Sequence, residues 1–210
     1  MKHNYFLETI KAVNGVVYNI TFHQQRYENV LRSFGVKKKE DLASLLFPPK
    51  NGIYRCRIVY SLDKIIEITY HPYIKREINS IKLIESDDII YDKKYTNREK
   101  LNQLFSQKGD CDEVLIVKNN LLCDTTIANI ALYKKKQWFT PKKPLLYGTT
   151  LMRYQDKLIF KDIGIKDLQE YSHIAFLNAM IDFDIKKIDI SHNNIISLSP
   201  ILNPSYLRIC

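Results

Sequence analysis

Residues 91–100 read YDKKYTNREK, a charged stretch in the middle of the chain. Thr96 and Glu99 have the spacing of a capping box and predict a helix over residues 96–107. Lys93 and Lys94 would then lie just before a helix N-terminus, where the helix dipole disfavours cations. A local conflict of this kind, without an evident compensation, indicates a functional position.

Lysines in such a place can carry chemistry. Positive surroundings and partial desolvation lower the pKa of a lysine, and the neutral amine can then attack a carbonyl carbon. The alternative is that Lys93 and Lys94 both point into water, as most surface lysines do. The rest of the chain decides between these interpretations.

Composition and charge limit the class of protein. The chain has 210 residues, enough for one compact domain or two small interdependent lobes. Its net charge of +9 suits anionic partners such as phosphorylated cofactors and carboxylate substrates. The basic residues are scattered in short runs, such as Lys134–Lys136 and Lys142–Lys143, rather than gathered on one helix. We therefore expect these runs to be exposed loops and expect no nucleic-acid partner.

The cysteines and apolar runs point to a cytoplasmic protein. The four cysteines stand far apart, without a CxxC pair or a histidine at metal-ligand spacing, so we expect reduced thiols and no metal. No apolar run approaches the ~20 residues that cross a bilayer. The N-terminus MKHNYFLETIK lacks the apolar core of a secretion signal. We expect no membrane partner.

Residues 1–73 predict a small α/β lobe. Asn14-Gly15 separates two extended runs and predicts a hairpin. Thr21 and Gln24 form a capping box for a helix that ends at Gly35. The other elements expected here are a short helix at 39–47, strands at 54–60 and 65–70, and a proline-containing linker at 71–75.

Residues 74–210 predict a larger, strand-rich lobe with a second short helix that begins near Gly148. Polar turns such as Asn119-Asn120 separate its extended runs. The expected fold is therefore α+β, with two lobes of unequal size. The strands expected here are 78–84, 113–118, 127–133, 157–161 and 173–178.

Lys94-Tyr95-Thr96-Asn97-Arg98 resembles the K-x-x-N-R segment of the class IV (fold type IV) pyridoxal-phosphate enzymes. That family includes aminodeoxychorismate lyase, branched-chain aminotransferase and D-amino-acid aminotransferase. The resemblance extends over nearly the whole chain, and the motifs come in the family's order. It implies pyridoxal 5'-phosphate held by Lys94 as a Schiff base, a pseudo-barrel as the larger lobe, a site between the lobes and a homodimer.

The N-terminal motifs resemble the family's E-x-x-K/R, NG and H-x-x-R opening. They are Glu8-Thr9-Ile10-Lys11, Asn14-Gly15 and His23-Gln24-Gln25-Arg26. The resemblance implies that Arg26 binds the cofactor phosphate, a role that suits guanidinium geometry. The alternative is an arginine that extends past the apolar helix face into solvent. Thr9 and Lys11 are candidates for contacts with substrate carboxylates.

Two further segments resemble cofactor-binding motifs. Asp124-Thr125-Thr126-Ile127-Ala128-Asn129-Ile130 is similar to the family's E-x-x-x-x-N segment, in which the acid pairs with the pyridine nitrogen. Asp124 replaces the usual glutamate, and the alternative is a turn aspartate bonded to its own backbone. Gly148-Thr149-Thr150 is similar to the family's phosphate loop, where free amides at a helix start bind the phosphate.

The resemblance favours 4-amino-4-deoxychorismate lyase, with Lys94 as general base, and leaves a branched-chain or D-amino-acid aminotransferase as the alternative. A cofactor-free basic binding module on a degenerate scaffold is the alternative from another class. It draws on the charge of +9, on Asp124 and on a family strand that is expected ahead of Tyr5 and does not occur there. His173, Asn178 and Met180 lie in a run that the family places near the site, although core packing explains them equally well.

Overall fold

The computed structural model describes residues 5–190, 195–201 and 207. Its contacts divide the chain into two compact units. The first unit comprises the chain up to Lys75 together with Lys93–Asn97, and the second comprises Arg76–Asp92 and the chain from Arg98 onward. The predicted α+β fold is confirmed. No helix in the described part of the chain is both long enough and apolar enough to span a membrane.

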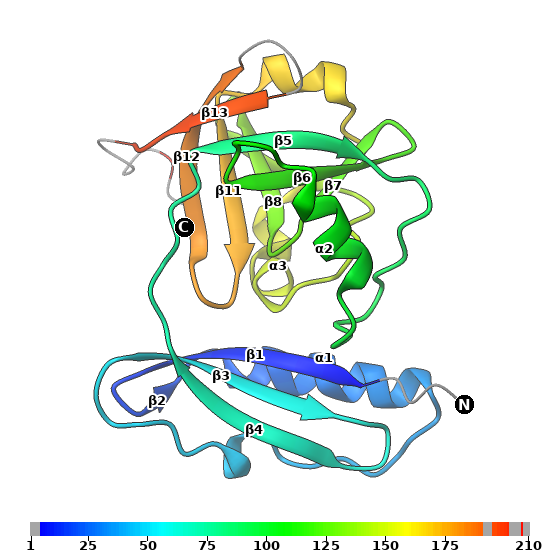
Figure 1. Cartoon of the computed structure of the whole chain (residues 1–210), viewed down its shortest axis with the longest axis vertical. Coiled ribbons are helices and arrows are strands. Elements are labelled where there is room, and N and C mark those ends of the chain that lie inside the picture. The colour runs from blue at the N-terminus through cyan, green and yellow to red at the C-terminus, as the bar shows by residue number, and fades with distance from the viewer. Residues whose placement is uncertain (1–4, 191–194, 202–206, 208–210) are drawn as a thin grey trace. The chain divides into compact units, whose positions relative to one another are not determined.

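The first unit is an antiparallel sheet with one long helix packed on it (Figure 1). The predicted hairpin is confirmed, because Asn14 (φ 49°) and Gly15 (φ 82°) adopt the positive φ values of a tight β-turn. Alternate residues of the first strand face the helix, and among them Phe6 and Ile10 are fully buried. The sheet order is β2 (Val16–Val17), β1 (Phe6–Val13), β3 (Ile53–Tyr60) and β4 (Ile65–Pro72), and the helix is α1 (Ile20–Ser33).

Two predicted helix features of this unit are wrong. Helix α1 begins one residue after Asn19, which adopts a left-handed conformation, so Thr21 and Gln24 form no capping box. Gln24 instead accepts a hydrogen bond from the backbone N–H of Leu42 (2.9 Å). The side chains of Tyr27 and Gln24 on α1 accept hydrogen bonds from the backbone N–H groups of Glu40 and Leu42. In place of the predicted helix at 39–47 there is therefore a single 3-10 turn, η1 (Ala43–Leu45).

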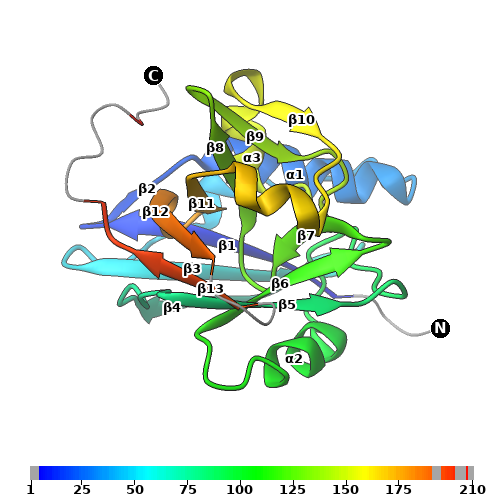
Figure 2. The same ribbon diagram turned by 90° about the horizontal axis from the view of Figure 1, so that it is seen from above.

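The second unit is built on a nine-stranded sheet that curls around a hydrophobic core (Figures 1 and 2). Most neighbouring strands are antiparallel, whereas β5 runs parallel to β6 and β9 runs parallel to β10. The strand order is β10 (Ile159–Lys161), β9 (Gln137–Pro141), β8 (Asn129–Lys134), β11 (His173–Asn178), β12 (Asp182–Ile190), β13 (Ile195–Ser199), β5 (Ser80–Glu85), β6 (Glu113–Lys118) and β7 (Leu121–Thr125). Its helices are α2 (Glu99–Ser106), α3 (Thr149–Tyr154), η2 (Gln155–Lys157) and η3 (Ile165–Glu170).

All five strands predicted for this region are present, and β7, β9, β12 and β13 are additional. β7 and β9 are each five residues long and follow tight turns, at Asn119-Asn120 and Lys135-Lys136, where both residues have positive φ. Lysine rarely adopts this conformation, so the second turn was hidden in a charged run. β12 alternates charged and apolar residues except at Lys186-Lys187, where two charged residues are adjacent, and this break hides the strand pattern in the sequence.

Candidate active site

The segment that carries Lys94 is fixed by backbone contacts to the start of β1. The N–H of Leu7 donates to the carbonyl of Lys94 (2.8 Å), and the N–H of Thr96 donates to the carbonyl of Tyr5 (2.9 Å). Because Thr96 is used in this bridge, helix α2 begins only at Glu99, and no capping box with Thr96 forms. The predicted conflict between Lys93 and Lys94 and a helix dipole is therefore wrong. Lys94 instead lies beside β1, the strand that carries Glu8.

Glu8, His23 and Arg26 form a buried ionic cluster in the first unit. The Glu8 carboxylate accepts hydrogen bonds from Arg26 Nε (2.8 Å), Arg26 Nη2 (2.6 Å) and His23 Nδ1 (2.6 Å). Arg26 is only 8% exposed, so the alternative of an arginine that extends into solvent is wrong. His23 and Arg26 lie three residues apart and so share one face of α1.

The protonation states in this cluster are set by burial and by its charges. Burial alone would raise the pKa of Glu8, but the charge of Arg26 and the hydrogen bonds from His23 and Arg26 lower it to about 2. Burial lowers the pKa of His23 more than the Glu8 carboxylate raises it, and the charge of Lys94 lowers it further. His23 is therefore neutral, and its Nε2 is buried without a hydrogen-bond partner in the described part of the chain.

We expect mild acid to destabilise the protein through His23. The unfolded chain takes up a proton near the ordinary histidine pKa of 6.5, whereas the folded chain takes it up only at lower pH. The contribution of His23 to the free energy of unfolding is thus complete above pH 6.5 and falls below it, by at most about 1.4 kcal/mol per pH unit. In His23→Gln, the melting temperature should fall less between pH 6.5 and pH 5 than it does in wild type. The control His71→Gln, at an exposed residue of the same unit, should follow wild type, and equal slopes for both variants would contradict the assignment.

Asp124 is a buried carboxylate in the second unit, near the end of β7. Its Oδ1 accepts a hydrogen bond from Asn129 Nδ2 (2.7 Å), and its Oδ2 accepts one from the backbone N–H of Leu146 (3.0 Å). The alternative of a turn aspartate is therefore wrong. Burial raises the pKa of Asp124 to about 7, against the lowering effect of these hydrogen bonds. A carboxyl group that is both buried and close to ionisation at neutral pH is suited to pair with a cationic N–H group.

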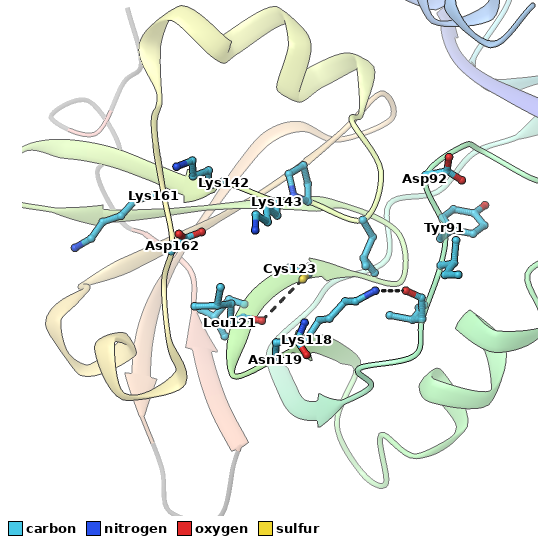
Figure 3. A pocket seen from close by; sticks show the side chains of 15 residues that line it. Tyr91, Asp92, Lys118, Asn119, Leu121, Cys123, Lys142, Lys143, Lys161 and Asp162 are labelled. Carbon is cyan, nitrogen blue, oxygen red and sulfur yellow. Dashed lines mark hydrogen bonds between the residues drawn. The ribbon is translucent and has the colours of Figure 1, made fainter. Parts of the chain in front are cut away.

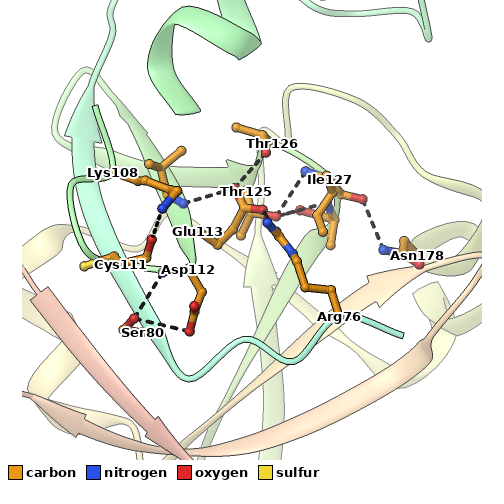
Figure 4. A network of polar contacts seen from close by, with 12 residues as sticks. Arg76, Ser80, Lys108, Cys111, Asp112, Glu113, Thr125, Thr126, Ile127 and Asn178 are labelled. Atoms are coloured by element: carbon orange, nitrogen blue, oxygen red, sulfur yellow. Dashed lines mark hydrogen bonds and ion pairs between the residues drawn. The ribbon is translucent and has the colours of Figure 1, made fainter. Parts of the chain in front are cut away.

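The loop from Thr125 to Ala128 connects Asp124 to Asn129, and three residues outside it hold it in place (Figure 4). The loop is tied internally by Thr125, whose Oγ1 donates to the carbonyl of Ala128 (3.1 Å). Glu113 accepts a hydrogen bond from Thr126 Oγ1 (2.7 Å) and is itself held by Arg76, whose Nη2 donates to it (2.7 Å). Arg98 donates a hydrogen bond to the carbonyl of Thr126 (2.8 Å). Sequence reasoning missed Glu113 and Arg76, because only the fold brings them to this loop.

Gly148 lies directly against Asn129, just before helix α3. Its N–H donates to Asn129 Oδ1 (3.1 Å), and a Cβ atom built on Gly148 would approach that oxygen to 2.2 Å. Thr149 and Thr150 follow as the first, buried residues of α3. The φ of Gly148 (−71°) is accessible to any residue, so its backbone conformation does not require glycine. The close approach of Asn129 does.

We expect Gly148→Ala to destabilise the protein by about 1–3 kcal/mol, because Asn129 cannot move without losing its hydrogen bonds to Asp124 and to the carbonyl of Leu146. The control is Gly164→Ala, which also has a negative φ (−84°) but whose Cβ would meet its nearest neighbour at 3.5 Å. Thermal unfolding of both variants checks the prediction. Equal melting temperatures for the two variants would show that the contact with Asn129 does not exclude a Cβ atom at position 148.

The remaining predicted residues are less closely gathered. Thr9 and Lys11 are half-buried on the face of β1 opposite Glu8. Asn178 donates to the carbonyl of Ile127 (3.3 Å) and caps the turn before β12 by accepting from the N–H of Met180 (2.9 Å). His173 is buried in β11, beside Ser172. In the first unit, the charge of Lys94 acts on His23, which shares the Glu8 carboxylate with Arg26. In the second unit, Asn129 joins Asp124 to Gly148. Thr9, Lys11 and His173 join neither group.

The fold is that of the fold type IV enzymes. The family model for amino-transferase class IV matches residues 6–188, and the chain belongs to this family. The family depends on pyridoxal phosphate, which confirms the predicted cofactor.

Known relatives cover most of the chain. An uncharacterised protein of Haemophilus influenzae is 34% identical over 181 residues, which are 82% of this chain and 96% of the relative. A solved structure from Haemophilus somnus 129PT, a proposed 4-amino-4-deoxychorismate lyase, is 36% identical, with a TM-score of 0.77 over 86% of this chain and 97% of its own. A solved structure from Mesorhizobium loti, a proposed amino-acid aminotransferase, is 16% identical, with a TM-score of 0.71 over 87% of this chain and 98% of its own. This last structure shares the fold.

Proposed function

We propose that this protein is a pyridoxal-phosphate enzyme that eliminates pyruvate from 4-amino-4-deoxychorismate and leaves 4-aminobenzoate for folate synthesis. The observation that supports the chemistry most directly is the buried Asp124 carboxylate, with a pKa raised to about 7 by burial. The choice of substrate is supported by the relative from Haemophilus somnus, itself a proposed lyase of this kind. The proposal includes a cytoplasmic homodimer, as the family resemblance implies.

The residues present fit the cofactor. Asp124 offers a carboxylate that is already oriented by Asn129 and Leu146, which suits a protonated ring nitrogen. Thr149 and Thr150 begin α3 directly after Gly148, at a helix start where backbone N–H groups favour an anion. We assign the phosphate to Gly148, Thr149, Thr150 and Arg26, with Thr125 supporting the ring. The Arg26 guanidinium is oriented for this role by its two bonds to Glu8.

Lys94 Nζ is assigned both the covalent attachment of the cofactor and the movement of protons. Bound pyridoxal phosphate would supply an electron sink that makes a C–H bond next to the substrate amine acidic. Lys94 Nζ would take up that proton and return one as pyruvate leaves. The charge of Lys94 lowers the pKa of His23, so the amine lies within the electrostatic field of the Glu8–His23–Arg26 cluster. Thr9 and Lys11 are assigned to the substrate carboxylates.

An assay of the purified protein against two sets of substrates tests the proposal. With 4-amino-4-deoxychorismate we expect equal amounts of pyruvate and 4-aminobenzoate, and with amino acid and 2-oxo acid pairs we expect little turnover. Turnover of only the second set would identify an aminotransferase and refute the lyase. A colourless protein that takes up no added pyridoxal phosphate would favour the cofactor-free binding module.

A further inference from the structure

The second unit contains a pocket of about 360 Å³ that is separate from the residues assigned to the cofactor (Figure 3). Neither Asp124 nor Gly148 lines it. Cys123 does, and because Cys123 and Asp124 are successive residues of β7, their side chains point to opposite faces of the strand. The lining comes from residues 89–92, the β6–β7 hairpin, residues 142–145 and residues 161–162.

The floor of this pocket is apolar and uncharged. Ile89 and Cys123 line the pocket, and each is less than 5% exposed. Burial raises the pKa of the Cys123 thiol to about 11, so the thiol stays protonated and is a poor nucleophile. The floor therefore suits the hydrophobic part of a ligand.

The rim of the pocket is basic. Lys118 lines the pocket and its Nζ donates to the carbonyl of Ile89 (2.6 Å), while Lys142, Lys143 and Lys161 are exposed (Figure 3). In the described part of the chain none of these four lysines forms an ion pair. The acidic lining residues are only Asp92 and Asp162, so the pocket has an excess of positive charge.

We infer that this pocket binds a small carboxylate with an apolar body, about the size of a benzoate. Its volume is at the lower end of the range of roughly 300–1,000 Å³ for small-molecule sites. The floor offers contacts to a ring, and mobile lysine amines offer charge to a carboxylate. Lys142 and Lys143, which the sequence alone assigns to a solvated loop, thereby gain a role in binding.

Binding of 4-fluorobenzoate to the cofactor-loaded protein, followed by fluorine NMR, tests the inference. We expect saturable binding to wild type and a loss of affinity of about tenfold or more in K142E/K143E, because two attractive charges become repulsive. The matched control K135E/K136E changes the same charge in the exposed β8–β9 turn, outside the pocket, and should bind as wild type does. All variants are first compared by thermal unfolding.

Each other outcome overturns the inference. These outcomes are no saturable binding to wild type, equal affinity in K142E/K143E, or an equal loss in K135E/K136E. Fluorobenzene binding as tightly as 4-fluorobenzoate would remove the role of charge, and inorganic phosphate competing equally well would remove the role of the apolar floor. The readout is binding rather than turnover, so failure of the proposed lyase reaction leaves this test unaffected. Lys94→Ala should retain the binding.

Discussion

Replacing Lys94 with alanine is expected to lower the turnover of 4-amino-4-deoxychorismate by at least about 10³-fold, since proton transfer by a positioned side chain alone contributes roughly 10²–10⁴-fold. The variant also loses the amine assigned to the covalent attachment of the cofactor. The fold should persist, because Lys94 is held by its backbone carbonyl, which accepts from Leu7 N–H in any residue at this position. Steady-state kinetics and the absorbance of the bound cofactor measure the two losses separately.

Lys93→Ala is the matched control, because it removes the same charge from the adjacent residue. The Lys93 amine lies over the Phe34 ring (5.5 Å), a contact worth about 0.5–1 kcal/mol at an exposed site. We therefore expect a small loss of stability and near-normal turnover. If Lys93→Ala loses turnover as Lys94→Ala does, the chemistry depends on the charge of the whole segment rather than on one amine.

Replacing Asp124 with asparagine is expected to lower turnover by about 10²-fold or more. Removal of one partner of a buried charge pair costs roughly 3–5 kcal/mol, and each 1.36 kcal/mol corresponds to tenfold in rate. Asparagine keeps the shape of the side chain and one acceptor oxygen, so the hydrogen bond to either Asn129 or Leu146 survives. Asp110→Asn, at an exposed position of the same unit, is the control and should leave turnover unchanged.

The pH dependence of stability separates the charge of Asp124 from its packing. Burial raises the pKa of Asp124 from 3.8 to about 7. Between these pH values Asp124 is therefore protonated in the folded chain and ionised in the unfolded chain. The free energy of unfolding therefore falls as pH rises between these values and stays level above about pH 7. Without cofactor, Asp124→Asn should be more stable relative to wild type at pH 8 than at pH 5, by about 2 kcal/mol. The same difference at both pH values would contradict a buried, uncompensated carboxyl group.

Elements that depend on local sequence could be predicted. The Asn14-Gly15 hairpin and helix α1 have strong local signals, and the start of α3 after Gly148 needed only a glycine and the polar residues that follow it. The family motifs also predicted the fold class and the cofactor, because each motif is a short run of residues with a chemical role.

Features that depend on long-range contacts could not be predicted. Thr96 has the local signature of a helix cap, yet its N–H bonds to Tyr5, 91 positions earlier in the chain. The Glu8–His23–Arg26 cluster joins a strand to a helix, although the spacing of His23 and Arg26 already placed them on one face. Glu113 carries no sequence signal of its role, because its contact with Thr126 follows from the pairing of β6 with β7.

Identification of the residue that holds the cofactor is the most direct test of the central claim, that Lys94 carries the chemistry. Borohydride reduction of the cofactor-loaded protein, followed by proteolysis and mass spectrometry, locates the attached pyridoxyl group. We predict that it is found on Lys94 alone and that Lys94→Ala carries none. A pyridoxyl group on Lys93 or on another lysine, or a wild-type protein without one, would contradict the claim.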